Sequence, residues 1–492
     1  MIENNLPIFQ VIIPLIGAVL CAIIKERKIA WFIAAISSWA VLGVVVILVL
    51  RVSAFGSLFY QFGGWEPPIG IQYQIDSLSA FILLLVSAIA VVMITYARES
   101  VGAEIDPDKQ HLFYTIWLLC FAGLIGMVST NDIFNIYVFL EISSLATYTL
   151  IAMGKTRRAL FSAFEYLVLG TIGATFFLIG IGLLYMMTGT LNITDIAERL
   201  GNAGDMRPVE AAFAFITLGL ALKIALFPLH TWLTNAYAYA PSFASAFLAS
   251  TAAKVAIYIM IRVLYTVFGY EFSFNVMPLG IILLLLSIAG MIIASLIAIW
   301  QKDVKRLLAF SSVAQIGYIM LAIGLATQEG LTAGILHMAN HALAKGALFM
   351  SVGAVVFYTG SSRLEDFRGA AKQMPFTMAV FVVGGLSLIG LPFTAGFVSK
   401  WMLLSAILQK GWWIVAVIVL ITSILALIYI WKVVEAAYFK PRPAGAVKLE
   451  EAPAGMLVPM WLLVLANIYF GINTNATLGL ASDAASMLFG GK

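Results

Sequence analysis

Charged side chains are scarce in this sequence. Asp, Glu, Lys and Arg make up 11% of its 492 residues and hydrophobic residues make up 62%, whereas soluble domains are roughly a quarter charged. The core of a water-soluble domain cannot bury so many apolar residues. A lipid bilayer can, because a helix of about 20 apolar residues crosses its hydrocarbon core. The composition therefore excludes a string of soluble domains and predicts an all-α polytopic membrane protein folded as one helical bundle.

Cysteine is almost absent. Cys21 and Cys120 lie in separate apolar runs, which excludes a disulfide framework and a metal site built of cysteines. The chain also lacks an opposed histidine pair suited to haem, so no redox centre, metal or other cofactor is expected in it. The first apolar run, Ile8 to Ile24, follows a short acidic stretch instead of the basic start of a cleaved signal, and is expected to be the first span.

Long apolar runs separated by polar residues, glycine and proline predict about fourteen transmembrane helices. Two runs are too long for a simple span, and each contains a proline: Pro228 in the seventh and Pro392 in the twelfth. A proline removes a helix hydrogen bond and clashes with the preceding turn, so both helices are expected to be broken within the membrane. The predicted segments are 7–24, 30–51, 77–97, 111–129, 132–153, 162–188, 209–240, 243–268, 277–300, 304–326, 331–358, 376–407, 411–436 and 455–473.

The basic residues predict the orientation, because lysine and arginine accumulate in cytoplasmic loops. The loops that join even to odd helices, together with the termini and the helix ends near them, contain six of these residues: Arg51, Arg199, Arg207, Arg262, Lys410 and Lys492. The loops that join odd to even helices contain eighteen, so these loops are placed in the cytoplasm and both termini outside. The eighteen are Lys25, Arg27, Lys28, Arg98, Lys109, Lys155, Arg157, Arg158, Lys302, Lys305, Arg306, Arg363, Arg368, Lys372, Lys432, Lys440, Arg442 and Lys448.

An internal repeat is visible at an offset of 171 residues. Asn131-Asp132 matches Lys302-Asp303, Thr188-Gly189 matches Thr359-Gly360, and the two helix-breaking prolines pair at a slightly shorter offset. Asp132 and Asp303 are predicted to cap the helices that follow them. Each copy holds five helices, and an odd number predicts that the second copy is inverted in the membrane, as in ion-coupled transporters. The predicted organisation is helices 1–3 in residues 1–110, helices 4–8 in 111–270, helices 9–13 in 271–440, and helix 14 with a tail in 441–492.

Ionisable residues inside the predicted spans carry the functional prediction. A charge near the bilayer centre costs roughly 3 kcal/mol, so such residues are rare and usually functional. Removal from water favours the neutral form of both lysine and glutamate, so each can exchange a proton near neutral pH, with histidines completing a relay between them. The three members in the eleventh helix are spaced by four and share one face. The set is Glu141, Lys223, Lys254, His337, His341, Lys345 and Lys400.

For several of these ionisable residues, a purely structural role stays open as well as a role in the relay. Lys223 and Lys400, whose depth depends on a helix break, could reach the membrane interface with their flexible stems. His230, just after Pro228, could cap carbonyls freed by the break or join the relay. Glu165, in the predicted first turn of the sixth helix, fits the cytoplasmic surface or the helix dipole as well as a role in the relay.

Several motifs resemble one family. They are KIALFPLHTWL at 223–233 and LASTAAKVAIYIMIR at 248–262, supported by GGW at 63–65, DSLS at 76–79, EIS at 141–143, APS at 240–242, HMANHALAK at 337–345 and GLPF at 390–393. Over almost its whole length the chain resembles the antiporter-like membrane subunits shared by Mrp-type multisubunit sodium/proton antiporters, respiratory complex I and membrane-bound hydrogenases. Lysine at position 400, where the middle complex I subunit typically has glutamate, makes it most similar to the D-type subunit of the Mrp antiporters.

This resemblance implies a role for each matching residue. Glu141 and Lys223 would form the modulating ion pair of a first half-channel. Thr234-Asn235 departs from the family, which often has proline and an acidic residue there, so no carboxylate role is carried over to this position. From the ion pair, the proton axis would continue through Lys254, His337, His341 and Lys345 to Lys400, the terminal donor of a second half-channel.

The buried charges and the resemblance together predict a proton-translocating subunit of a sodium/proton antiporter in a prokaryotic cell membrane. Such a chain is a transporter, not an enzyme, and assembles with other membrane subunits. The alternative is a subunit of a redox-driven complex, a membrane-bound hydrogenase or a complex I-like NADH:quinone oxidoreductase, whose redox centres would lie in other chains. An organic-solute carrier would need a polar cavity shaped for its substrate, and a structural scaffold would leave so many buried charges unexplained.

Overall fold

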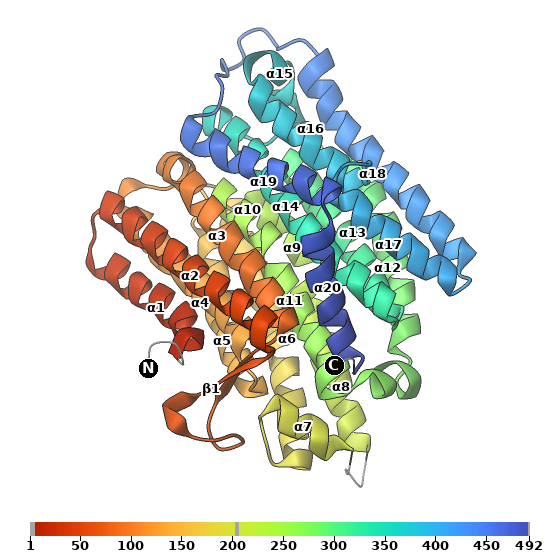
Figure 1. Cartoon of the computed structure of the whole chain (residues 1–492). Coiled ribbons are helices and arrows are strands. Elements are labelled where there is room, and N and C mark those ends of the chain that lie inside the picture. The colour runs from red at the N-terminus through yellow and green to blue at the C-terminus, as the bar shows by residue number, and fades with distance from the viewer. Residues whose placement is uncertain (1–4, 202–205, 491–492) are drawn as a thin grey trace.

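Helices account for nearly all of the secondary structure in the computed structural model, which describes residues 5–201 and 206–490 (Figure 1). Within those residues, twelve helical segments are long and apolar enough to cross a membrane, so the prediction of an all-α polytopic membrane protein is confirmed. They are α1 (Leu6–Ile23), α2 (Arg27–Phe55), α3 (Ser77–Glu104), α4 (Gln110–Ser129), α5 (Ile133–Ala152), α6 (Arg157–Thr188), the segment Ser242–Val267, α12 (Leu279–Trp300), α13 (Val304–Gly324), α14 (Gln328–Thr359), α18 (Trp413–Phe439) and α19 (Ala454–Ile472).

Two further membrane-length stretches are divided helices, as the prolines predict. The first consists of α8 (Arg207–Ile224) and α9 (Thr231–Tyr239), with Pro228 between them. The second consists of α16 (Pro375–Ile389) and α17 (Ala395–Gln409), with Pro392 between them. Each first half ends on a residue with positive φ, Ala225 at 62° and Gly390 at 90°, so the chain leaves the helix in the left-handed conformation that often ends helices.

A third interruption was not predicted. The expected continuous span 243–268 is divided into α10 (Ser242–Ser250) and α11 (Ala252–Ile261), and it ends in a π-helical turn at Arg262–Val267. Thr251, at the junction, has φ −124° and ψ −56°, and its hydroxyl donates to the carbonyl of Phe247 at 2.7 Å. The predicted span is present, but no proline marks the interruption within it.

One set of contacts occurs twice, 171 residues apart. The side chains of Asp132 and Asp303 cap α5 and α13 by accepting from backbone N–H groups three residues on, at 2.7 and 2.9 Å, which confirms the predicted caps. Both aspartates form isolated antiparallel bridges, to Asn192 and Arg363. The flanking backbone bonds match as well: Ile133 N to Leu191 O and Ile193 N to Asn131 O in one place, Val304 N to Ser362 O and Leu364 N to Lys302 O in the other.

Helix α14 lies in the middle of the bundle. It packs against α10, α13, α16, α17, α19 and α20, and every residue from Gly330 to Val356 is buried. By contrast, α2, α6, α12 and α18 present large exposed apolar side chains, such as Trp39, Phe161, Ile281 and Ile424, as expected of surfaces that face lipid or partner chains. The central position of α14 therefore places its histidines and its lysine in the interior.

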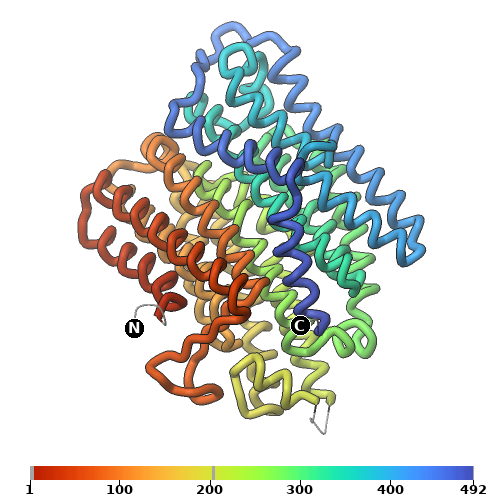
Figure 2. Tube along the Cα trace, viewed as in Figure 1, coloured from red at the N-terminus to blue at the C-terminus, as the bar shows by residue number. Residues whose placement is uncertain are grey.

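The remaining elements are short and were not predicted. An antiparallel hairpin pairs β1 (Leu58–Gln61) with β2 (Gln72–Ile75), and α7 (Ile193–Leu200) follows α6 at the same end of the molecule (Figure 1). Helix α15 (Ala370–Gln373) precedes α16. Within the predicted tail, α20 (Asn475–Leu488) packs against α14 and α3, so the last helix returns to the N-terminal third of the chain (Figure 2).

Candidate functional site

The four lysines predicted within the membrane all lie in the interior of the bundle. Lys223, Lys254, Lys345 and Lys400 are each at most 6% exposed. Their ammonium groups bond to hydroxyl and carbonyl oxygens. Among residues 5–201 and 206–490, none of the four forms an ion pair with a carboxylate. Neutral oxygens accept a hydrogen bond from a charged or an uncharged amine, so these contacts do not fix the charge of the lysines.

Lys223 occupies the last turn of α8, immediately before the first break. Its Nζ donates to Ser144 Oγ at 2.7 Å and to Tyr148 OH at 3.3 Å, both on α5. The same nitrogen lies 5.7 and 5.8 Å from the ring centres of Tyr148 and Tyr166, which adds a cation–π attraction. The side chain therefore points across the bundle to α5 and does not extend towards an interface.

Glu141 lies three residues before Ser144, on the same face of α5. It is half-buried, and its Oε1 is shielded from solvent with no hydrogen-bond partner in the described part of the chain. The resemblance implied an ion pair between Glu141 and Lys223, but the structure has Ser144 as the partner of the lysine instead. The Ser144 hydroxyl itself donates to the carbonyl of Leu140 at 2.6 Å, so no direct hydrogen bond links the lysine to the glutamate in the described chain.

The break between α8 and α9 is stabilised by an aromatic side chain. Trp232 Nε1 donates to the carbonyl of Leu222 at 2.9 Å, one of the acceptors that the end of α8 leaves open. The indole stacks on Tyr166, with ring centres 3.7 Å apart. His230 lies in the break against Phe227, with ring centres 5.2 Å apart, and its Nδ1 has no partner among the described residues.

Lys254 lies in the first turn of α11, just after the unpredicted interruption at Thr251. Its Nζ donates to the carbonyl of Ala249, at the end of α10. The end of a helix leaves carbonyls without intrahelical partners, so the ammonium group of Lys254 replaces a backbone donor there. Lysine and helix break therefore occur together at this position, as they do at Lys223.

The two histidines of α14 differ in their surroundings. His337 bridges two other helices: its Nδ1 lies 2.8 Å from Ser399 Oγ on α17, and its Nε2 lies 2.9 Å from Gln315 Oε1 on α13. His341 is parallel to it, with ring centres 6.2 Å apart, and both of its ring nitrogens are buried without a partner in the described chain. Since buried polar atoms are nearly always hydrogen-bonded, His341 marks a place where water would complete the network.

Lys345 follows His341 by one helical turn of α14, and Lys400 lies on α17 next to the partner of His337. Lys345 donates to the carbonyl of Leu308 at 2.7 Å and to the hydroxyl of Ser311, both on α13. Lys400 is the residue after Ser399, the partner of His337. Its Nζ lies 4.4 Å from the ring centre of Tyr318 and donates to three oxygens: Leu388 O at 2.8 Å, Ile389 O at 3.2 Å and Ser423 Oγ at 3.2 Å. Two of these are carbonyls at the broken end of α16.

Glu165 is placed differently from the prediction. Helix α6 begins at Arg157, so Glu165 lies in its third turn and not in its first. Its Oε2 accepts from Asn235 Nδ2 on α9 at 2.7 Å. Asn235 is one of the two positions at which the sequence departs from its family, and here it partners the carboxylate directly. The helix-dipole interpretation therefore does not fit this position, whereas the cytoplasmic-surface and relay interpretations stay predictions.

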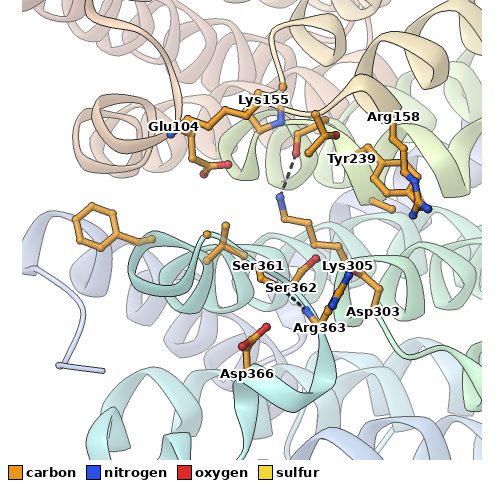
Figure 3. Close-up of a pocket in the computed structure, with 18 of the residues that line it drawn as sticks. Glu104, Lys155, Arg158, Tyr239, Asp303, Lys305, Ser361, Ser362, Arg363 and Asp366 are labelled. Atoms are coloured by element: carbon orange, nitrogen blue, oxygen red, sulfur yellow. Dashed lines mark hydrogen bonds between the residues drawn. The ribbon is translucent and has the colours of Figure 1, made fainter. Parts of the chain in front are cut away.

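A polar cavity of about 810 Å³ lies at the end of the molecule where α3, α9, α13 and α14 meet (Figure 3). Lys305 enters it from the start of α13 and donates to the carbonyl of Ala240 at 3.1 Å. Opposite, the carboxylate of Glu104 accepts from the backbone N–H of Ser242, at the start of α10, at 3.0 and 3.2 Å. Every basic residue that lines this cavity belongs to the eighteen that the sequence assigns to the cytoplasmic side.

Sequence reasoning missed the groups that hold the lysines and His337 in place. Ser144, Ser311 and Ser399 are ordinary serines within apolar helices, and their partners are 79, 34 and 62 residues away in the chain. Asp76 was noted only as part of a motif, yet it forms a buried ion pair with Arg262. The single local signal was spacing, because Glu141, Ser144 and Tyr148 recur at three and four residues along one helix face.

A bundle with divided helices and ionisable side chains buried at the breaks is the arrangement of many ion-coupled transporters. The sequence profile of the NADH:quinone oxidoreductase/Mrp antiporter transmembrane family matches residues 130–426. The chain belongs to this family, and it is an antiporter-like membrane subunit of Mrp-type or complex I-like assemblies.

Individual relatives come from both branches of the family. The chain is 41% identical to NADH-quinone oxidoreductase subunit N of Desulforudis audaxviator, over 95% of this chain and 96% of that protein. It is 28% identical to the D-type subunit of the Na(+)/H(+) antiporter of Alkalihalophilus pseudofirmus, over 95% and 94%. Its fold matches a chain of the Mrp complex from Dietzia sp. DQ12-45-1b with a TM-score of 0.91 and 26% identity, over 99% and 98% of the two chains.

Proposed function

We propose that this chain is the proton-translocating subunit of a multisubunit monovalent cation/proton antiporter, and that protons move along a row of buried side chains. The observation that carries the proposal is that all four interior lysines bond only neutral oxygens. A lysine paired with a carboxylate would be held in its charged form, whereas these lysines remain able to take up and release a proton. The row consists of Glu141, Lys223, Lys254, His337, His341, Lys345 and Lys400.

Contacts in the structure support the two ends of this row. Glu141 and Lys223 share the α5 face through Ser144, next to the first break. His337 is hydrogen-bonded to Ser399, whose neighbour in the chain is Lys400. Between these two ends, Lys254 on α11 and Lys345 on α14 lie in the centre of the bundle. His230 and Glu165 stay candidate members of the row beside its first half.

The architecture proposed for this function is two inverted five-helix repeats within about fourteen spans. The repeated set of bonds at Asp132 and Asp303 supports a common origin of the two halves. The two divided helices, α8 with α9 and α16 with α17, support it as well. An inverted repeat allows one half to open towards each side of the membrane around a fixed central site.

We place the chain in a prokaryotic cell membrane with both termini outside. The distribution of lysine and arginine supports this orientation. The polar cavity that Lys305 enters is lined by basic residues of the predicted cytoplasmic set, and these residues come from separate parts of the chain (Figure 3). Since its relatives belong to multisubunit assemblies, the partners proposed for this chain are other membrane subunits, together with protons and sodium ions.

A second candidate shares the chemistry and differs in the source of energy. The 41% identity to a subunit of an NADH-quinone oxidoreductase, against 28% to an antiporter subunit, favours a proton-pumping subunit of a redox-driven complex. In that case electrons would pass through other chains, and this chain would move protons in response. The two candidates predict different energy requirements, which an experiment can separate.

The experiment measures cation-induced pH changes in everted membrane vesicles from cells that express the whole operon. For the first candidate, wild-type vesicles exchange sodium for protons without an electron donor, and Lys223→Ala or Glu141→Ala abolishes the exchange while the complex still assembles. Lys372→Ala, a basic residue in α15 outside the row, is the control and keeps full exchange. Exchange that needs an added electron donor supports the second candidate, and full exchange in Lys223→Ala contradicts both.

A further inference from the structure

A second cavity adjoins the polar cavity of Figure 3 and is much more basic. It encloses about 630 Å³ and shares five wall residues with the first: Arg158, Tyr239, Asp303, Arg363 and Glu365. Its wall contains two carboxylates and seven basic side chains, and we refer to it as the basic cavity. The seven are Arg158, Lys302, Arg306, Arg363, Arg368, Lys432 and Lys440.

The carboxylates leave most of this charge unbalanced. Asp303 is already engaged, since its Oδ1 accepts from Arg306 N at 2.9 Å and its Oδ2 accepts from Ser362 Oγ at 2.5 Å. Glu365 is exposed at the rim. Among the described residues, the only ion pair of a wall residue is that of Lys440 with Glu435, at 3.3 Å. The interior of the basic cavity therefore attracts anions.

Two arginines in the wall have donors without acceptors. The Nε atoms of Arg306 and Arg368 are buried and have no hydrogen-bond partner in the described chain. Arg306 is also held in position, because its guanidinium lies 5.9 Å from the ring centre of Phe310. Buried donors are nearly always paired, so a ligand with several acceptor oxygens would satisfy them. A phosphate group matches the planar fork of arginine in this way.

The surface beside the basic cavity indicates what carries the phosphate. Three of its wall positions directly follow large exposed apolar residues: Gln301 follows Trp300, Lys432 follows Trp431, and Lys440 follows Phe439. These three aromatic side chains are 81%, 50% and 68% exposed. Below them, the outer faces of α12 and α18 are apolar, with Leu296, Ile421, Ile424, Leu427 and Ile428 exposed. Acyl chains could lie along these two helices while the head group occupies the cavity.

We propose that the basic cavity binds the phosphate of an anionic phospholipid, with the acyl chains against α12 and α18. Orientation of the chain in the membrane needs basic loops, but it does not need them to converge on one cavity or to bury guanidinium donors. Basic pockets between transmembrane helices on the cytoplasmic side are suited to lipid head groups. A free phosphate ion would use the same donors, but it would gain nothing from the apolar faces below.

The test is lipid binding to the purified complex from cells that express the whole operon. Dioleoyl phosphatidylglycerol or dioleoyl phosphatidylcholine is titrated into the complex in detergent, and bound lipid is counted by native mass spectrometry. Phosphatidylglycerol is expected to bind more tightly. Arg306→Gln should weaken it about fivefold and the double variant with Arg368→Gln about 25-fold, since each basic residue contributes about 1 kcal/mol. Arg27→Gln, on the same predicted side in α2, is the matched control and leaves binding unchanged.

Several results would overturn the proposal. Equal affinity for the two lipids would remove the anionic preference, and unchanged phosphatidylglycerol binding in the double variant would remove the basic cavity. Competition by inorganic phosphate at the concentration of the lipid would assign the cavity to a soluble anion. If the double variant does not assemble, the exposed rim variant Lys302→Gln replaces it, with an expected loss of about fivefold.

Discussion

Replacing Ser144 with alanine tests whether Lys223 works through its contact with α5. The serine hydroxyl is the nearest partner of the ammonium group, at 2.7 Å, and Tyr148 is more distant at 3.3 Å. A hydrogen bond to a charged group contributes about 1.5–3 kcal/mol. Because Tyr148 remains, the lower end of this range applies. A loss of about 1.5 kcal/mol lowers the population in which Lys223 is correctly positioned about tenfold. Sodium-dependent proton exchange should therefore fall about tenfold in Ser144→Ala.

The neighbouring serine provides the control. Ser143 is also buried on α5, but its hydroxyl donates only to the backbone carbonyl of Leu140, at 3.0 Å. Ser143→Ala should keep near wild-type exchange in everted vesicles, and Ser144→Thr, which retains a hydroxyl, should recover most of the activity. Undiminished exchange in Ser144→Ala, or an equal loss in Ser143→Ala, would show that this contact does not position the lysine.

Two other perturbations test the packing of the bundle by thermal unfolding in detergent. Gly396→Ala should destabilise the protein by about 3 kcal/mol, because the new Cβ would clash with the backbone carbonyl oxygen of Ser387. Gly182→Ala, whose new Cβ meets nothing within 4 Å, should not, and equal melting temperatures of the two variants would refute the clash. Asp76→Asn should cost about 3–5 kcal/mol at neutral pH, because it leaves Arg262 buried without its counter-ion. Burial alone would raise the pKa of Asp76, but the charge of Arg262 holds this pKa below its ordinary value. The stabilisation by the ion pair is therefore complete above pH of about 4, near the pKa of an unfolded aspartate, and is lost as the pH falls through the lower pKa of the folded state. The difference in melting temperature between wild type and Asp76→Asn should shrink over that range, and a difference independent of pH would count against the ion pair.

Much of the fold is predictable from the sequence because its signals are local. Apolar run length sets where helices form, and Pro228 and Pro392 mark two of the breaks, since a proline acts on its own helix. The break at Thr251 has no such signal. It is stabilised by a contact of Lys254 with the carbonyl of Ala249, and the consequences of that contact depend on how α10 packs against α14. The amphipathic helix α20 was missed for a similar reason, because its stability comes from packing on α14 and α3.

The site was predictable only in part. Ionisable residues in apolar runs are conspicuous in a sequence, so Glu141 and the four lysines could be found and their burial inferred. The partners of the lysines could not, because Ser144 and Ser311 look like any other small polar residue of a membrane helix. The missing ion pair between Glu141 and Lys223 has the same cause: which oxygen the ammonium meets depends on the rotation of α8 against α5, and neither helix encodes that alone.

The three bonds of Lys400 have a mechanical consequence. A lysine ammonium has three N–H donors, and Lys400 uses all of them, on Leu388 O, Ile389 O and Ser423 Oγ. After the loss of its proton the amine keeps two, so either a carbonyl at the end of α16 is released or the hydroxyl of Ser423 turns round to donate to the nitrogen. Departure of a proton would thereby loosen the joint between α16 and α17 or tighten α17 on α18. The charge state of one nitrogen and the shape of a transmembrane joint would then change together, as an ion-coupled machine requires.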